Sequence, residues 1–347
     1  PFVTDAIRKR CENEVLGYTG KPDSYYNAII NWVKQRYDLI VTKEVINFVP
    51  GIVPGIGMAM NCFTQKGDKV MIQPPVYHPF AWVTTRNERT LVINPLRWEN
   101  GMYRMDLDAF REQIKGCKLF ILCNPHNPGG VVWTEAELRA IADICYDEKV
   151  LVFSDEIHAD LTLPPHTHRP FATVSEKARM NSVTFMSPSK AFNMPGLSAS
   201  HALIFNEDLR KRFRIYMDAG ELDMGHVFAF LSVEAAYSHG TEWLDQCLAY
   251  IQGNIDFVDE FLKKHAPKIK AIRPEASYLV WLDCRELELS QKDLNEFFVD
   301  KAHLALNDGE MFGKEGIGFM RLNVASPRCI IEKAMKQLAD AYQLYIK

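Results

Sequence analysis

The stretch Lys118-Leu-Phe-Ile-Leu-Cys123 runs directly into Asn124-Pro-His-Asn-Pro-Gly-Gly130, and these two segments decide the predicted fold. The first segment is almost continuously apolar, as strands are when both faces of their sheet are covered. The second is rich in Asn, Pro and Gly, the residues typical of a turn that follows a strand. The pattern predicts a central strand whose carboxyl end opens into a loop.

Further apolar runs with β-rich composition lie on both sides of this stretch and alternate with helical patterns. The other predicted strands are Val45–Val49, Lys69–Gln73, Val150–Phe153, Val183–Met186 and Ala202–Phe205. Between them, Thr134-Glu-Ala-Glu137 has the spacing of a helix capping box and precedes a helical apolar face. This βαβα order predicts an α/β fold with a mostly parallel sheet and helices on both of its faces.

The pattern of predicted strands and helices changes after about residue 240. A long helical stretch (Glu242–His265) is followed by a strand-like run (Tyr278–Leu282), a helix near Gln291–Lys301 and a C-terminal amphipathic helix. We therefore predict a large α/β domain over residues 1–240 and a smaller α+β domain over residues 241–347.

Composition excludes several classes of function. The 347 residues carry a formal net charge of −4, and their 40 basic side chains are spread along the chain, so a nucleic-acid or anionic membrane partner is not expected. No apolar run is long enough to span a bilayer. The eight cysteines form no C-x-x-C pair, which predicts free thiols, no metal site and a cytoplasmic location.

Four chemically useful side chains follow four of the predicted strands, namely Tyr77, Asn124, Asp155 and Lys190. In open α/β sheets, ligands bind outside the carboxyl ends of the strands, so we expect these side chains to meet at one edge. A lysine there can condense with the aldehyde of pyridoxal phosphate (PLP). Asp155 would keep the pyridine nitrogen protonated, Asn124 would hold the phenolic oxygen, and Tyr77 would stack on the ring.

The phosphate of such a cofactor needs its own cradle. Gly51-Ile-Val-Pro-Gly55 lies between a predicted strand and a helix, where the free N–H groups of Gly51, Ile52 and Val53 favour an anion. The hydroxyls of Ser187 and Ser189 could add hydrogen bonds. The glycine spacing matches neither G-x-G-x-x-G nor a P-loop, which argues against a nucleotide site.

These motifs carry a family resemblance. Asn124–Gly130, Ser154-Asp-Glu-Ile-His158 and Ser187-Pro-Ser-Lys-Ala-Phe-Asn193 resemble the fold-type I PLP enzymes, which have the aspartate aminotransferase-like fold. Val15–Gly20, Pro74–Phe80 and Gly318–Asn323 resemble the carbon–sulfur lyases of the MalY/PatB type, within the class I and II aminotransferase superfamily. The resemblance extends over nearly the whole chain.

The resemblance implies a role for each site residue. Lys190 would form the Schiff base with PLP, Asp155 would pair with the pyridinium, and Tyr77 would contact both cofactor and substrate. Arg321 would bind the α-carboxylate of an amino-acid substrate, with Asn124 beside it. Tyr18 would reach the phosphate in the neighbouring subunit, which implies a homodimer with shared sites.

Three positions depart from the aminotransferase pattern. His158 stands where aminotransferases commonly carry a tyrosine, Ser198 replaces a phosphate-binding arginine, and His78 replaces the second ring of a Tyr-Tyr pair. His158 could hold the cofactor, or it could simply bond to neighbouring backbone. The departures at His158 and Ser198 favour a lyase.

The predicted reaction is the α,β-elimination of cysteine or cystathionine to pyruvate, ammonia and a sulfide or thiol. Two alternatives stay open. One is an aminotransferase, since fold and cofactor do not decide between the two reactions. The other is a catalytically silent regulator with the same fold.

Overall fold

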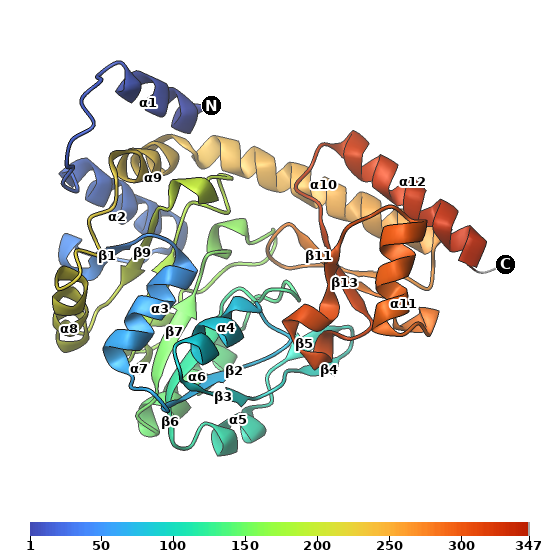
Figure 1. Cartoon of the computed structure of the whole chain (residues 1–347), viewed down its shortest axis with the longest axis horizontal. Coiled ribbons are helices and arrows are strands. Elements are labelled where there is room, and N and C mark those ends of the chain that lie inside the picture. The colour runs from blue at the N-terminus through green and yellow to red at the C-terminus, as the bar shows by residue number, and fades with distance from the viewer. Residues whose placement is uncertain (346–347) are drawn as a thin grey trace.

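A seven-stranded sheet forms the centre of the computed structural model, which describes residues 1–345 (Figure 1). The strand order is β1-β9-β8-β7-β6-β2-β3, and all neighbours from β8 to β3 are parallel. The strands are β1 (Ile46–Val49), β2 (Lys69–Ile72), β3 (Thr90–Ile93), β6 (Cys117–Cys123), β7 (Leu151–Asp155), β8 (Ser182–Met186) and β9 (Ser200–Leu203).

The predicted strands of this sheet are confirmed, with ends that differ by one or two residues. Strand β3 was not predicted, because it lies at the sheet edge and its residues are either exposed or half-buried. Strand β9 is antiparallel to both β8 and β1. The connection from β8 to β9 contains a 3-10 turn at Pro195–Leu197 but no α-helix, whereas a parallel neighbour is usually reached through a crossover helix.

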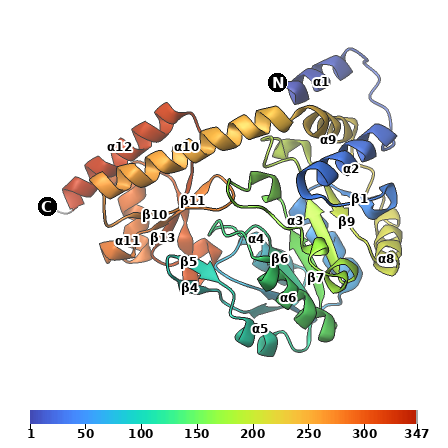
Figure 2. The same cartoon turned by 180° about the vertical axis from the view of Figure 1, so that it is seen from behind.

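Helices cover both faces of the sheet, as predicted (Figures 1 and 2). Alternate residues of β6 point to opposite faces: Phe120 belongs to a core with α5 and α6, whereas Ile121 belongs to a core with α3 and α8. The helices of this part are α1 (Phe2–Cys11), α2 (Asp23–Tyr37), α3 (Ile52–Phe63), α4 (Pro79–Arg86), α5 (Leu107–Gln113), α6 (Glu135–Asp147), α7 (Glu176–Met180), α8 (Glu207–Asp218) and α9 (Val227–His239).

The predicted capping box at the start of α6 is confirmed. The side chain of Thr134 accepts a hydrogen bond from the backbone of Glu137, whose carboxylate accepts one from the backbone N–H of Thr134. A small hairpin of β4 (Arg97–Glu99) and β5 (Met102–Arg104) stands apart from the main sheet.

The C-terminal part contains a second sheet, in which all neighbouring strands are antiparallel. Its strands, in spatial order, are β10 (Lys270–Ile272), β11 (Leu279–Asp283), β13 (Phe319–Asn323) and β12 (Asn307–Asp308). Its helices are α10 (Thr241–His265), α11 (Gln291–Glu296) and α12 (Arg328–Tyr345). The domain boundary at residue 240 stays a prediction, and the last two residues of the predicted small domain lie outside the described part of the chain.

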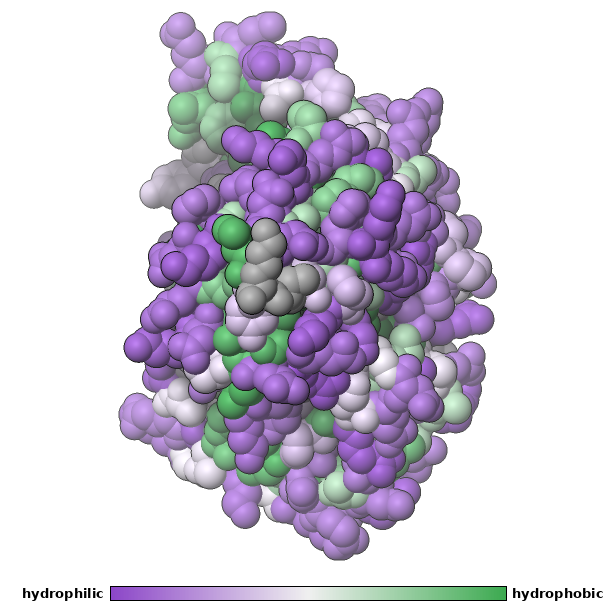
Figure 3. Space-filling model, turned by 90° about the vertical axis from the view of Figure 1, so that its right-hand side faces the viewer, coloured by the Kyte–Doolittle hydropathy of each residue, from purple (hydrophilic) through white to green (hydrophobic). Residues whose placement is uncertain are grey.

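The two sheets share apolar packing. Trp281 of β11 and Phe319 of β13 stack with ring centroids 5.2 Å apart, and both belong to the same buried cluster as Phe120 of the main sheet. The face formed by the C-terminal part is mainly hydrophilic, with hydrophobic residues in small separate groups (Figure 3). No helix within residues 1–345 is long and apolar enough to cross a membrane.

Candidate active site

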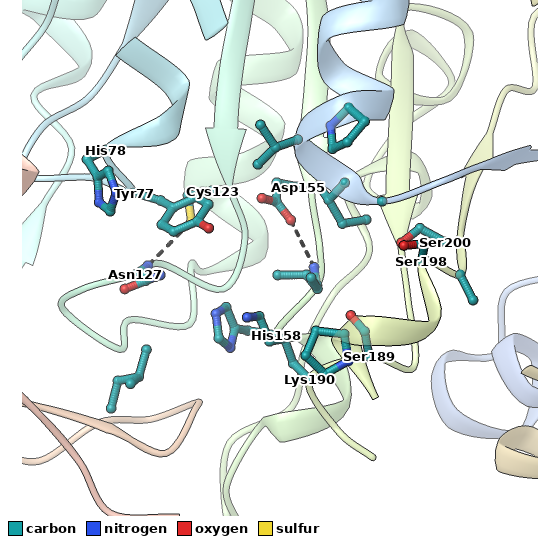
Figure 4. Close-up of a pocket in the computed structure, with 18 of the residues that line it drawn as sticks. Tyr77, His78, Cys123, Asn127, Asp155, His158, Ser189, Lys190, Ser198 and Ser200 are labelled. Atoms are coloured by element: carbon teal, nitrogen blue, oxygen red, sulfur yellow. Dashed lines mark hydrogen bonds between the residues drawn. The ribbon is translucent and has the colours of Figure 1, made fainter. Parts of the chain in front are cut away.

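A cavity of about 500 Å³ lies where the parallel strands end. It brings together residues from both sheets and from the start of α3, so segments far apart in the sequence meet in it. Asp155 lies between Tyr77 on one side and Ser198 and Ser200 on the other, with Lys190 nearby (Figure 4). Of the residues predicted for the site, the cavity is lined by Gly51, Ile52, Val53, Tyr77, Asp155, His158, Ser189, Lys190 and Arg321.

Asp155, the last residue of β7, is a buried carboxylate. Its Oδ1 accepts a hydrogen bond of 3.1 Å from the backbone N–H of Ile157 (Figure 4). Burial raises the pKa of Asp155 to about 7, and the neighbouring Glu156 adds to this, while the Ile157 hydrogen bond and Lys190 act in the opposite direction. The site therefore holds a carboxylate whose ionised form a cationic partner would stabilise strongly.

Lys190 enters the cavity from the loop that follows β8. Burial lowers the pKa of its ammonium group, and Arg321 lowers it further, whereas Asp155 raises it. A lower pKa makes the neutral amine more available, and a neutral amine is what a nucleophile or a general base must supply.

Arg321 reaches the cavity from β13 of the second sheet. Its Nη1 donates to Asn127 Oδ1 and its Nη2 donates to Asn307 Oδ1, each at 2.8 Å. Its Nε is buried and has no partner among the described residues. Burial lowers the pKa of Arg321 to about 10, so the group stays cationic at neutral pH and can bind a carboxylate.

The prediction for Asn124 needs correction, because the cavity is lined by Asn127 and not by Asn124. The backbone N–H of Asn124 donates to the carbonyl of Asp155 at 2.9 Å, which extends the contact of β6 with β7, and its side chain donates to the carbonyl of Arg169 at 3.1 Å. Both asparagines precede a proline within one turn, so the sequence pattern alone did not distinguish them.

The start of α3 supplies backbone donors to the cavity. Gly51 is the N-cap of α3 and the helix has no side-chain cap, so the first N–H groups are free to bind an anion. The φ angle of Gly51 is 151°, and a Cβ there would lie 3.3 Å from Pro54 Cδ, which favours glycine at this position. Ile52 and Val53 line the cavity beside it.

Of the two serines predicted to hold the phosphate, Ser189 lines the cavity and Ser187 does not. Ser189 lines the cavity together with Ser198 and Ser200. The sequence analysis considered Ser198 only as the replacement of a phosphate-binding arginine and did not predict Ser200. Ser187 lies behind them, since its Oγ donates to the carbonyl of Ala199 at 2.7 Å and is 2.9 Å from Ser189 Oγ. It can orient Ser189 but does not line the cavity.

Tyr18 lies outside the cavity in the described chain. It sits between α1 and α2 and is 97% exposed. Its predicted contact with a phosphate therefore requires a second subunit, and the prediction that it acts across a dimer stays untested.

His158 is buried and lines the cavity. Burial lowers its pKa to about 3, and the positive charges of Lys190 and Arg321 contribute, so the ring is neutral. Its Nδ1 has no hydrogen-bond partner among residues 1–345, so this atom makes none of the backbone bonds that the purely structural interpretation required. Cys123 and Tyr278 also line the cavity and were not predicted as site residues, since each occurs within or beside an apolar strand run.

This set of groups fits pyridoxal phosphate. The buried carboxylate of Asp155 suits a protonated pyridine nitrogen, and the amine of Lys190 suits an aldehyde. The uncapped start of α3 and three serine hydroxyls suit a phosphate. Two buried nitrogens, Nδ1 of His158 and Nε of Arg321, have no partner within the described chain, and a bound polar ligand would supply one.

Comparisons with known proteins agree with this geometry. The family model described as aminotransferase class I and II matches residues 4–338. The chain is 37% identical over 341 residues to cystathionine beta-lyase PatB of Bacillus subtilis, covering 98% of this chain and 88% of PatB.

Two solved structures are also similar over nearly the whole chain. Cystalysin from Treponema denticola, which contains pyridoxal 5'-phosphate, has a TM-score of 0.97 and 34% identity, covering 100% of this chain and 88% of cystalysin. A PLP-bound protein from Clostridium difficile 630, described as an aminotransferase, has a TM-score of 0.96 and 40% identity, covering 99% of this chain and 89% of that chain.

Proposed function

The chain belongs to the class I and II aminotransferase family, and within this family we propose that it catalyses the PLP-dependent α,β-elimination of sulfur-containing L-amino acids. The products are pyruvate, ammonia and a thiol or sulfide. The observation that carries the proposal is that Lys190, Asp155 and Arg321 line one cavity. The similarity to PatB, a cystathionine beta-lyase, supports the choice of substrate class.

When bound, PLP supplies an electron sink for the electron pair that is left on the substrate Cα after deprotonation. We propose that Lys190 holds its aldehyde carbon and that Asp155 holds the proton on its pyridine nitrogen. Asn127 and His158 would surround the ring beside Tyr77, and the start of α3 with the cavity serines would hold the phosphate.

The chain's own groups would then move the protons. The amino group of the substrate would first replace Lys190 at the aldehyde carbon, and the freed amine of Lys190, whose pKa burial lowers, would then take the proton from the substrate Cα. The C–S bond at Cβ breaks with both electrons going to sulfur, and the same lysine can return a proton to the leaving thiolate. The carbon skeleton is released by hydrolysis as pyruvate and ammonia.

Arg321 would bind the α-carboxylate of the substrate. Its side chain is held by Asn127 and Asn307 at 2.8 Å each, and the bidentate geometry of a guanidinium suits a carboxylate. With the carboxylate fixed, the Cα–H bond can be presented to Lys190 in a constant orientation, which is where an enzyme gains from positioning.

An aminotransferase would use the same lysine and aspartate, so it is the second candidate. The C. difficile structure described as an aminotransferase keeps it open. The experiment that decides incubates the purified holoenzyme with cysteine or cystathionine, with and without a keto acid. Pyruvate and sulfide or thiol formed without a keto acid support the lyase, whereas a new amino acid formed only with the keto acid would establish the aminotransferase. No product in either case would point to the silent regulator.

We also propose a homodimer with shared sites and a cytoplasmic location. The dimer would give the exposed Tyr18 a role, together with Val15 and Leu16, which are exposed in the same segment. All eight cysteines are free thiols, as expected in a reducing compartment.

A further inference from the structure

The residue after Asp155 is a second buried carboxylate, and it faces away from the cavity. Asp155 ends β7 and points into the cavity (Figure 4), whereas Glu156 is not among the residues that line it. Successive residues of a strand point to opposite faces, so the two carboxylates leave the end of β7 in opposite directions. The side chain of Glu156 is fully buried, and its backbone N–H donates to the carbonyl of Phe185 at 2.9 Å.

Three hydrogen bonds hold the carboxylate of Glu156. Its Oε1 accepts from the hydroxyl of Ser154 and from the backbone N–H of Phe171, each at 2.8 Å. Its Oε2 lies 2.7 Å from Nε2 of His168. Two of these partners, His168 and Phe171, belong to the loop that follows β7, so this loop fixes the orientation of the carboxylate.

The surroundings of His168 indicate that Glu156 is ionised. The ring of His168 is buried, and its Nδ1 has no partner within residues 1–345. Buried N–H groups without an acceptor are rarer than acceptors without a donor, so Nδ1 carries no proton and the ring proton is on Nε2. The carboxyl group of Glu156 then receives all three hydrogen bonds and donates none. It is therefore an anion fixed behind Asp155.

The other titratable groups around Asp155 in the cavity supply no negative charge. Burial raises the pKa of the phenol of Tyr77 and of the thiol of Cys123, and it lowers the pKa of the His158 ring, so all three are neutral at neutral pH. The amine of Lys190 carries a positive charge or none. Among these groups and Glu156, only Glu156 can add negative charge next to Asp155.

The effect of this charge depends on what lies in the cavity. Burial raises the pKa of Asp155, and the charge of Glu156 raises it further, because two like charges oppose each other. A cation beside Asp155 changes the balance, because both carboxylates attract it. A protonated pyridine nitrogen is such a cation.

We propose that Glu156 is a positioning residue for the cofactor: its charge, held behind Asp155 by His168, stabilises the protonated pyridine nitrogen of PLP. This inference rests on the proposed role of Asp155, but it does not depend on whether elimination or transamination follows. The competing explanation is that the hydrogen bonds of Glu156 only fasten the loop to the end of β7. That explanation predicts an effect on stability but none on the protonation of Asp155 or of the cofactor.

The test removes the charge of Glu156 and keeps its shape. Glu156→Gln can still accept both hydrogen bonds at Oε1, and its amide can donate to Nε2 of His168 when the ring takes its other tautomer. In the apoprotein, the carboxyl-carbon NMR signal of isotope-labelled Asp155, assigned with Asp155→Asn, should report a proton affinity roughly tenfold lower than in the wild type. In the holoenzyme, the nitrogen NMR signal of labelled PLP should move toward that of unprotonated pyridine.

Asp160→Asn is the matched control, because Asp160 is also a buried carboxylate in the segment after β7. The ring N–H of Trp32 and the hydroxyl of Tyr37 both donate to its Oδ1, which asparagine keeps. This variant should leave the titration of Asp155 unchanged.

Two variants of His168 test the same idea without altering Glu156. His168→Gln keeps a donor for Oε2 and should keep the wild-type titration of Asp155. His168→Phe leaves Oε2 without a donor, so Glu156 should hold a proton more readily, and the proton affinity of Asp155 should fall as in Glu156→Gln.

The outcomes separate this inference from the proposed function. An unchanged titration of Asp155 in folded Glu156→Gln would overturn the inference, and so would an equal shift in Asp160→Asn. If Glu156→Gln does not fold, equal titrations in His168→Gln and His168→Phe would overturn it instead. The expected shifts without cleavage of any sulfur amino acid would leave the inference standing and reject the elimination, whereas cleavage with an unshifted titration would do the reverse.

Discussion

Replacing Asp155 by asparagine should make the cofactor-free protein more stable at high pH. Burial raises the pKa of Asp155 to about 7, against an ordinary value of 3.8. The folded protein therefore holds this proton more tightly than the unfolded chain does. Between pH 4 and pH 7 the unfolded chain has lost the proton while the folded one keeps it, so the stability of the wild-type apoprotein falls as the pH rises through this window.

The size of the effect follows from the two pKa values. The complete penalty above pH 8 is roughly 4 kcal/mol, and roughly 2.5 kcal/mol of it develops between pH 5 and pH 8. Asparagine has the same shape, can still accept the hydrogen bond from the backbone N–H of Ile157, and does not ionise. Its advantage over the wild type should therefore grow by roughly 2.5 kcal/mol across this interval.

The assay is urea denaturation of both apoproteins at pH 5 and pH 8. The difference in the free energy of unfolding between Asp155→Asn and the wild type is determined at each pH, and the two differences are compared. Asp283→Asn is the control. Burial raises the pKa of Asp283, but the hydrogen bonds and charge of Arg285 outweigh burial and leave it below 3.8, so this variant should show no pH-dependent difference. An Asp155→Asn advantage that is the same at both pH values would refute the reasoning. Added PLP should reduce the pH dependence of the wild type, because ionised Asp155 then has a cationic partner.

Three further substitutions test the assignment of the site. Lys190→Ala should lose nearly all turnover and the borohydride-reducible adduct with PLP; an adduct that persists in this variant would remove the assignment. Asn127→Ala should raise the KM for the amino acid by about tenfold, because Arg321 loses an acceptor. Asn124→Ala should instead lower the melting temperature with little change in KM. Steady-state kinetics and thermal unfolding check both variants, and a raised KM in Asn124→Ala but not in Asn127→Ala would make Asn124 the site residue. Tyr18→Phe should weaken PLP binding by about ten- to a hundredfold. A mixture of the Tyr18→Phe and Lys190→Ala proteins should regain activity at limiting PLP once their subunits exchange. A mixture that stays inactive after demonstrated subunit exchange would exclude the shared site.

The main sheet could be predicted because its strands are buried on both faces. In the runs that became β6, β7 and β8, only Lys118 and Thr184 are polar, and such nearly continuous apolar composition indicates strands that are covered on both faces. The direction of β9 could not be predicted in this way. It depends on a connection without an α-helix, and the sequence between Ser187 and Ala199 did not indicate its path.

The site was predicted where a side chain directly ends a strand, and less well where a turn intervenes. Asp155 is the last residue of β7, so its place at the sheet edge is fixed by the strand itself. Asn124 and Asn127 lie in a turn, and the backbone path decides which of them faces the cavity. The same applies to Ser187 and Ser189, which are two residues apart but only one of which lines the cavity.

The phosphate end of the cavity explains why the predicted dimer matters for the cofactor. The cationic side chains of the lining are Lys190 and Arg321, and the proposed function uses one for the aldehyde and the other for the substrate carboxylate. Ser198 brings no charge to this end. The dianionic phosphate is then left to the partial charge at the start of α3 and to hydroxyl groups, which are weaker partners than a guanidinium. Under these conditions one more hydroxyl, donated by Tyr18 from a second subunit, would decide whether the cofactor stays bound.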